Sequence, residues 1–156
     1  MRGNEAVIKE LNAALRAELT AIVQYMVQAE VCANWGYQRL SGDTKKRAFD
    51  EMHHAESLIE RLLFLDAMPA VDIPLKPNIG ADVKAQMEFD LKDEHDAVAQ
   101  YNAASKTCRQ QADNGTRELF EKLLRDEEKH TDYLETQLHT IGEIGIANYL
   151  SEHLKD

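Results

Sequence analysis

Apolar residues recur every three or four positions along four long stretches of the chain. This spacing places apolar side chains on one face of a helix, so it predicts amphipathic helices and not strands. The stretches span about 4–35, 44–67, 81–112 and 116–141, and a shorter stretch follows at 146–154. No segment alternates apolar and polar residues as a half-buried strand does. The pattern therefore predicts an all-α fold with four long helices and a short fifth C-terminal helix.

The segments between these stretches predict the order in which the helices pack. Residues 36–43 carry a helix breaker, Gly42, and a capping residue, Asp43, and the Asp-Asn-Gly run at 113–115 is a turn signal. All three prolines fall between the second and third stretches: Pro69, Pro74 and Pro77. So long a connection lets the second and third helices run parallel. We expect a four-helix bundle with one long crossover between helices two and three, as a single domain over residues 1–156.

Glutamates interrupt the apolar faces of the predicted helices. Glu18 lies between Leu15 and Ile22 in the first helix, where burial favours an apolar side chain. Glu94 has the corresponding place in the third helix. A carboxylate that faces a bundle core costs free energy unless it is paired or bound to a metal. On one helix alone, an edge residue facing water explains Glu18 equally well, so the decision depends on the rest of the chain.

A Glu-x-x-His motif occurs twice and is the strongest chemical signal in the chain. On a helix its two side chains lie one turn apart on the same face, so both can reach one metal ion. The motif of the second helix recurs 76 residues later in the fourth helix (51 to 127), and the glutamate of the first helix recurs 76 residues later in the third (18 to 94). We call this correspondence between the two halves of the chain the repeat. A single copy is ordinary on the solvated face of an acidic helix, but two matched sets are not. The matched residues are Glu18, Glu51 and His54 in the first half of the chain and Glu94, Glu127 and His130 in the second.

In a folded bundle these six side chains converge on one level of the core. Four glutamates and two histidines from four helices are the arrangement of di-iron and di-manganese carboxylate proteins. Carboxylates can bridge two ions, and a neutral imidazole is a terminal ligand that suits iron. Four carboxylates also balance the charge of two divalent ions. The residues therefore predict a dinuclear metal centre that is both the metal-binding and the catalytic site.

Two aspartates follow the same repeat. Asp50 and Asp126 each directly precede a motif glutamate, so they match one another as the glutamates do. They are placed either to hydrogen-bond a ligand histidine or to line a solvent route. His53 does not repeat, because Lys129 occupies its matching position. The remaining histidines lack matched partners, and we expect them on the surface: His95, His139 and His153.

Composition narrows the class of protein and of partner. The 156 residues are 44% hydrophobic and 29% charged, which is typical of a soluble globular protein. The net charge of -10 argues against nucleic acid and anionic membranes as partners. Two cysteines, Cys32 and Cys108, are too few and too far apart for a disulfide framework, so we expect buried thiols in a reducing cytoplasm. No apolar run approaches the roughly 18 residues of a membrane span.

Several short runs resemble the bacterioferritin family along essentially the whole chain. They are Met1-Arg2-Gly3, Asn34-Trp35-Gly36, Asp50-Glu51-Met52-x-His54-Ala55, Ile59-Glu60-Arg61, Asn78-Ile79-Gly80, Leu124-Arg125-Asp126-Glu127-Glu128 and Asn148-Tyr149-Leu150. The resemblance implies a ferritin-like bundle in a cytoplasmic shell of 24 identical subunits, built from two-fold dimers, which oxidises Fe(II) and stores it as a ferric mineral. It implies two iron ions per subunit, bridged by Glu51 and Glu127 and capped by the other four matched residues.

The resemblance also suggests a role for Met52. From the residues alone, a methionine on a helix flank is gap-filling core or interface. In bacterioferritins the methionine at this place is an axial ligand of a b-type haem, which two subunits share across a two-fold axis. The family further implies a small ferredoxin as electron donor. The implied apolar walls of the haem site are Leu19, Ile22, Met26, Ala55 and Ile59.

Four positions depart from the commoner family pattern. Leu58, Tyr133 and Met26 stand in place of a frequent tyrosine, tryptophan and phenylalanine. Lys46 stands in place of a histidine that often binds an additional iron. An aromatic electron relay and an extra iron site are therefore left open. The leading hypothesis is an iron-storage ferroxidase, and the alternatives are a peroxide-reducing di-iron or di-manganese protein and a haem-binding cage that mainly transfers electrons.

Overall fold

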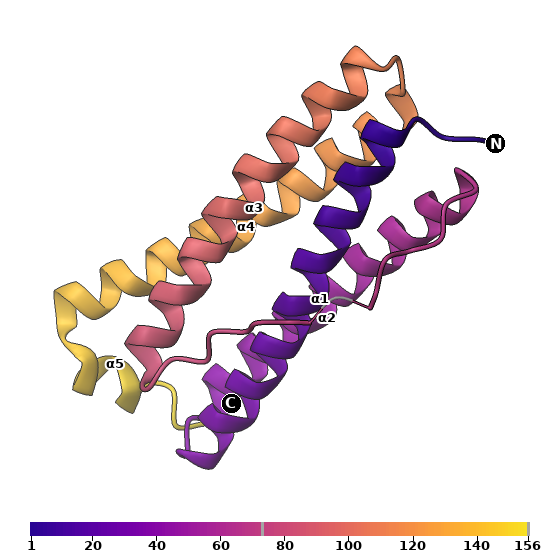
Figure 1. Cartoon of the computed structure of the whole chain (residues 1–156). Helices are drawn as coiled ribbons and strands as arrows, with labels where there is room; N and C mark the ends of the chain where they lie inside the picture. Colours follow the sequence, from indigo (N-terminus) through magenta and orange to yellow (C-terminus); the bar gives the residue numbers. More distant parts are fainter. Residues whose placement is uncertain (73, 156) are drawn as a thin grey trace.

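The computed structural model describes residues 1–72 and 74–155, and these residues form helices without any strand. The expected all-α class, with four long helices and a short fifth, is confirmed (Figure 1). The expected single domain over 1–156 includes Ile73 and Asp156, which lie outside the described residues. The helices are α1 (Glu5–Asn34), α2 (Gln38–Phe64), α3 (Val83–Gln110), α4 (Asn114–Ile144) and α5 (Ile146–Ser151).

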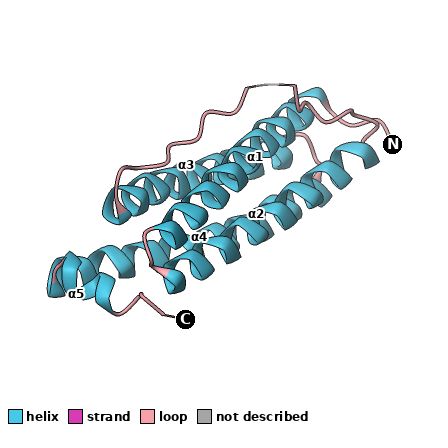
Figure 2. Cartoon of the chain, turned by 90° about the horizontal axis from the view of Figure 1, so that it is seen from below, coloured by secondary structure: helices cyan, strands magenta, loops and turns pink. Residues whose placement is uncertain are grey.

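Two helical hairpins lie side by side to form the bundle. Helix α1 packs mainly on α2 and α3 mainly on α4, while contacts of α1 with α3 and of α2 with α4 join the hairpins. The described parts of the connection, residues 65–72 and 74–82, run along the outside of the bundle between the end of α2 and the start of α3 (Figure 2). Helices α2 and α3 consequently run parallel, as the long proline-containing connection predicts.

Side-chain caps define three of the helix starts. The side chain of Asn4 accepts a hydrogen bond from the Ala6 amide at 2.9 Å, at the start of α1. The side chain of Asp82 accepts a hydrogen bond from the Ala85 amide at 2.8 Å, at the start of α3. The side chain of Asp113 accepts one from the Thr116 amide at 3.0 Å, at the start of α4. Each cap satisfies one of the backbone amides that a helix start leaves without a partner. The predicted turn at 113–115 is therefore the first turn of α4 and its cap.

The predicted start of the second helix is wrong. Helix α2 begins at Gln38, not at Thr44, so only residues 35–37 connect it to α1. Gly42 lies inside the helix, where a Cβ would meet nothing within 4 Å. Glycine in an exposed helix interior costs only about 1 kcal/mol, which the burial of Leu40 in the same turn can outweigh. The chain reverses instead at Gly36, whose φ of 93° is a left-handed conformation that glycine adopts without strain.

The last helices also differ slightly from the prediction. Helix α4 continues through Gly142 to Ile144 instead of stopping near 141, and α5 ends at Ser151 instead of 154. Gly145, with φ of 81°, separates the two helices. The expected surface position of His153 is wrong, because this residue is buried and its Nδ1 lies 2.6 Å from the carbonyl oxygen of Tyr149. His95 and His139 are exposed, as predicted.

The apolar core is split into two clusters along the bundle. One contains Leu11 and Leu15 of α1 with Leu58 and Leu62 of α2, and the other lies toward α5 and contains Leu134. Between them lies a layer of buried charged side chains, which is where the predicted ligands fall in all four long helices. The two cysteines are buried free thiols, as predicted. Within the described residues, no helix has both the length and the apolar character needed to cross a membrane.

Candidate metal centre

The six matched residues meet in the polar layer between the two apolar clusters. Each of the four long helices contributes, and all six side chains are buried. Ligand atoms approach within 4.8 Å of one another in two sets, which share Glu51 and Glu127. The Glu18 set consists of Glu18, Glu51, His54 and Glu127, and the Glu94 set of Glu51, Glu94, Glu127 and His130. Two carboxylates common to both sets are what bridging of two ions requires.

The donor atoms point at one another without forming hydrogen bonds. Nδ1 of His54 lies 2.8 Å from Oε1 of Glu127, and Nδ1 of His130 lies 2.9 Å from Oε1 of Glu51. Among the described residues none of these four atoms has a hydrogen-bond partner. Nitrogen and oxygen atoms this close to one another lie within reach of a shared ion. The nitrogen and oxygen donors therefore fit a pair of divalent metal ions such as Fe(II).

Asp50 and Asp126 hydrogen-bond the two histidines. Nε2 of His54 lies 3.1 Å from Oδ2 of Asp126, and Nε2 of His130 lies 3.1 Å from Oδ2 of Asp50. Of the two roles that the repeat left open, the hydrogen-bonding role is thus the one observed. A carboxylate acceptor keeps a proton on Nε2, so the proton that each imidazole loses when a metal binds is the one on Nδ1, which faces the cluster. Both contacts cross between the two halves of the repeat, so each half orients the histidine of the other.

Two tyrosines hydrogen-bond the outer glutamates. The hydroxyl of Tyr25 donates to Oε1 of Glu94 at 2.5 Å, and that of Tyr101 donates to Oε1 of Glu18. Both tyrosines are buried. The repeat matches Tyr101 to Tyr25, a correspondence that is not among the sequence predictions. The repeat itself was the signal that could have identified it.

A buried arginine lies beside the Glu94 set, and sequence analysis missed it. The guanidinium of Arg47 lies 4.7 Å from the ring centre of Tyr25 and 5.5 Å from that of Tyr133. It pairs with the Oδ2 atom of Asp90 at 3.4 Å, and both side chains are buried. The repeat gives no signal here, because Leu123 occupies the position that matches Arg47. The cation is therefore a feature of one half of the centre only.

Burial and mutual repulsion determine where protons reside in the cluster. Burial, followed by the charge of Glu51, raises the pKa of Glu18 well above its ordinary value. Burial and the neighbouring Glu127 do the same to the pKa of Glu94. Burial also opposes ionisation of Glu51, but its contacts with Glu18 and His130 outweigh burial and lower its pKa. The outer glutamates are therefore the ones that hold protons.

The histidines respond to the same carboxylates. Burial lowers the pKa of His54, but the adjoining Glu127 and Glu18 outweigh burial and raise it. Burial likewise lowers the pKa of His130, and Glu127 and Glu51 reverse the effect. Without a bound metal, protonated imidazoles and protonated outer carboxyls thus neutralise the layer. Metal ions that bind there must displace these protons.

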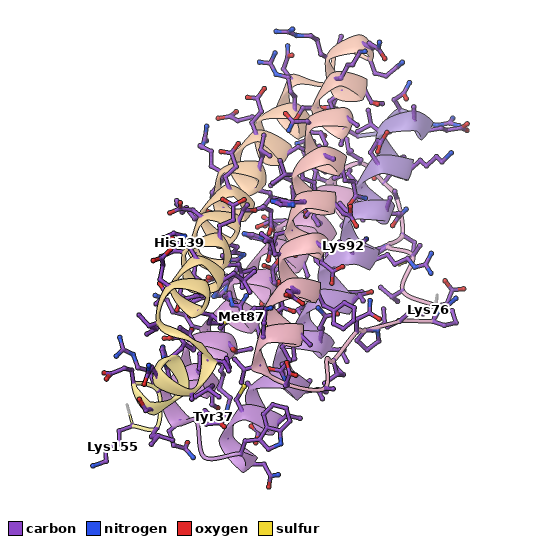
Figure 3. All side chains as sticks on the ribbon, turned by 90° about the vertical axis from the view of Figure 1, so that its left-hand side faces the viewer. Tyr37, Lys76, Met87, Lys92, His139 and Lys155 are labelled. Carbon is purple, nitrogen blue, oxygen red and sulfur yellow. The ribbon has the colours of Figure 1, made fainter. Side chains whose placement is uncertain are left out.

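A cavity of about 320 Å³ opens between α1 and α3 and ends at the cluster. Small residues on α1, including Ala17 and Ala21, and Ala97 on α3 line its sides. Lys76 of the crossover lies at the same cavity, beside the bundle (Figure 3). Because alanine side chains leave space between the helices, a small substrate can reach the buried carboxylates from the surface. The carboxylates at its inner end are Glu18, Glu51, Glu94 and Glu127.

The residues predicted to surround a haem, except Ala55, are exposed or half-buried on α1 and α2. Met52 and Met26 are exposed, at 36% and 49% of their surface. Leu19, Ile22 and Ile59 are half-buried and pack against the apolar core, whereas Ala55 lies within that core. Met52 thus adjoins Glu51 in sequence but faces away from the metal cluster. The haem and its ligation remain predictions.

Comparison with known proteins agrees with this geometry. The ferritin-like domain family matches residues 8–144. A bacterioferritin of Brucella melitensis is 40% identical over 149 residues, covering 96% of this chain and 92% of the relative. A bacterioferritin of Mycolicibacterium paratuberculosis is 39% identical over 152 residues, covering 97% of this chain and 96% of the relative. A bacterioferritin of Rhodobacter capsulatus is 39% identical over 145 residues, covering 93% of this chain and 90% of the relative. The chain therefore belongs to the bacterioferritin family of ferritin-like proteins.

Proposed function

We propose that this protein is an iron-storage ferroxidase, which oxidises Fe(II) to Fe(III) at the buried cluster and stores the product as a ferric mineral. The observation that carries the proposal is the pair of ligand sets that share Glu51 and Glu127 in the middle of the core. Four carboxylates and two imidazoles match the charge and the ligand preferences of two Fe(II) ions, which are the substrate. The similarity to proteins named bacterioferritin supports the same reaction.

Each residue of the cluster has a distinct part in the proposed reaction. Glu51 and Glu127 bridge the two metal positions, because each belongs to both sets. Glu18 with His54 caps one position, and Glu94 with His130 caps the other. Asp126 and Asp50 keep the protons of the two histidines on Nε2, so that Nδ1 is free to bind. The outer carboxyls release their protons as Fe(II) arrives.

The cavity between α1 and α3 is the proposed route to the centre. Its floor is formed by carboxylates that attract Fe(II), and its alanine-lined sides leave room for a small oxidant. Oxidation of buried iron pairs in a closed core also limits the release of partly reduced oxygen species. We propose O2 or H2O2 as the oxidant, since the same ligands serve both.

Storage requires many subunits around a common space. We propose that two chains first form a two-fold dimer and that dimers assemble into a cytoplasmic shell of 24 subunits. Met52 of each chain would hold a b-type haem shared by the two chains of a dimer, which would carry electrons from a small ferredoxin for iron release. The exposure of Met52 and Met26 supports an apolar partner on this flank.

Addition of Fe(II) in air to the purified protein tests the proposed function. We expect rapid oxidation, a ferric mineral retained with the protein, and a particle mass of many subunits. Glu51→Ala and Glu127→Ala should abolish the rapid phase of Fe(II) oxidation while the particle stays assembled. Glu128→Ala, at the neighbouring exposed position, is the control and should keep the rapid phase.

Several outcomes would contradict the proposed function. A small particle that forms no mineral would exclude storage. Fast consumption of H2O2 without mineral would favour a peroxide-reducing protein. Loss of assembly in the alanine variants would mean that the carboxylates are mainly structural.

A further inference from the structure

Each outer glutamate of the cluster accepts a hydrogen bond from a tyrosine of the opposite half. Tyr101 of α3 donates to Glu18 of α1, and Tyr25 of α1 donates to Glu94 of α3. The repeat relates the two pairs to one another. The accepting oxygen is Oε1 in each case, and the same oxygen lies 3.5 Å from Nδ1 of the histidine of its own set, His54 or His130. In both sets, the oxygen of the outer glutamate that contacts the histidine is thus the oxygen that the tyrosine holds.

Tyr101 is placed where an apolar residue would suffice for packing. Its side chain is fully buried, its ring lies 5.7 Å from that of Phe120, and Ala104 and Cys108 belong to the same apolar cluster. A hydroxyl in such surroundings costs free energy unless it is hydrogen-bonded. The carboxylate of Glu18 is the partner that it has. The hydroxyl of Tyr101 therefore needs an explanation beyond packing, and Glu18 provides it.

The two tyrosines differ in what covers their rings. Tyr25 lies under the guanidinium of Arg47 at 4.7 Å, so a change at Tyr25 also disturbs a buried cation and its partner Asp90. Tyr101 has only Phe120 as an aromatic neighbour among the described residues. Replacement of Tyr101 by phenylalanine consequently removes the hydroxyl and leaves the apolar packing in place. Tyr101 is the cleaner position at which to test the shared arrangement.

We propose that Tyr101 is a positioning residue of the Glu18 set, which fixes Oε1 of Glu18 beside Nδ1 of His54 so that both face one metal position. The proposal rests on the proposed function, because it assumes that the two sets bind two metal ions. The hydroxyl occupies one lone pair of the carboxylate oxygen and leaves another directed into the cluster. A glutamate side chain without this restraint samples several rotamers, and each metal-binding event must then reorder it.

Titration of the metal-free protein with Co(II) tests the proposal, with calorimetry and visible absorption as readouts. The wild type should bind two ions per chain. In Tyr101→Phe, one of the two should bind about 10- to 100-fold more weakly, the loss typical of removing a residue that orients a metal ligand, and the other should be unchanged. Tyr149→Phe is the matched control: its hydroxyl is also buried and bonds Gln137 at 2.6 Å, outside the cluster, so both affinities should persist.

A double-mutant comparison shows whether Tyr101 acts through Glu18. In a Glu18→Ala background the carboxylate is absent, so Tyr101→Phe should cause no further loss of Co(II) affinity. A merely structural role would lower the melting temperature of the metal-free protein and weaken both ions, with or without Glu18. Tyr101→Leu repeats the test should phenylalanine disturb folding.

The outcomes separate the failure of this inference from that of the proposed function. If the wild type binds fewer than two Co(II) ions per chain, the dinuclear centre itself is wrong and Tyr101 has nothing to position. Another outcome is that the wild type binds two Co(II) ions while Tyr101→Phe leaves both affinities unchanged or weakens both equally. In that case only the role of Tyr101 is overturned.

Discussion

At the scale of single residues, the candidate metal centre is a set of acids and bases whose protons a bound metal would replace. The pKa values of Glu18 and Glu94 are raised by burial and neighbouring negative charge. Those of His54 and His130 are raised by the surrounding carboxylates, which outweigh burial. The raised pKa favours the protonated form of each of these four groups in the metal-free protein, and each must lose its proton to become a ligand.

Metal binding should consequently release protons and strengthen as pH rises. Because each of the four groups has a pKa above its ordinary value, a fall in pH favours the proton-bound form and weakens metal binding. We expect the release of up to four protons per chain when two Zn(II) ions bind. Calorimetry in buffers of different ionisation enthalpy measures this number. Metal binding without proton release would contradict the proton assignment. So would metal binding that weakens as the pH rises from about 6 to about 8.

The hydrogen bond from His54 to Asp126 gives a second prediction. Asp126→Asn replaces the carboxylate acceptor by an amide and weakens control of the histidine tautomer. We expect Co(II) affinity to fall about 10- to 100-fold with little change in particle mass. Asp132→Asn, an exposed change on the same helix, is the control and should have no effect. Equal affinities in the two variants would mean that Asp126 does not orient His54.

At the scale of helices, apolar periodicity and the repeat predicted the bundle, the crossover and the convergence of the six residues. Helix ends were less predictable, because local signals competed with packing: Gly42 reads as a breaker, yet α2 runs through it. Arg47 and Asp90 pair across helices, a contact that no periodicity encodes. His153 is buried beyond the end of α5, where its carbonyl oxygen accepts a hydrogen bond from the Arg39 amide of α2 at 3.2 Å, a contact that the short apolar run there does not reveal.

Two glycines test the observed helix ends. Gly142 lies inside α4, and a Cβ there would meet nothing within 4 Å, so Gly142→Ala should stabilise the protein by about 0.5–1 kcal/mol. Gly80 has φ of 77°, and a Cβ would lie 2.7 Å from the amide nitrogen of Gln86. Gly80→Ala should therefore destabilise it by about 1–3 kcal/mol. Denaturant unfolding measures both, and destabilisation by Gly142→Ala would argue that α4 ends earlier.

At the scale of the whole molecule, the metal centre joins two halves that repeat one another. His54 contacts Asp126 and His130 contacts Asp50, and the two tyrosine–glutamate bonds also pair one half with the other. The outward flank of the first half instead carries Met52 and is available to a partner. One helix, α2, thus serves the interior of its own chain and the proposed dimer interface.

Met52→Leu tests the proposed haem site separately from the metal centre. Leucine keeps the apolar character of the flank but lacks the thioether ligand. We expect protein produced with ample haem to lose its low-spin haem absorption, while Fe(II) oxidation and particle mass stay the same. Retention of the haem spectrum would remove Met52 from the site, and loss of oxidation would mean that the two sites are not independent.

The central claim is that two metal ions bind between the four long helices, with Glu51 and Glu127 between them. Anomalous diffraction at the iron edge, from crystals soaked anaerobically with Fe(II), measures this most directly. We predict two peaks per chain, roughly 3.5–4 Å apart, one beside Glu18 and His54 and the other beside Glu94 and His130. A single peak, or peaks only outside this layer, would contradict the account.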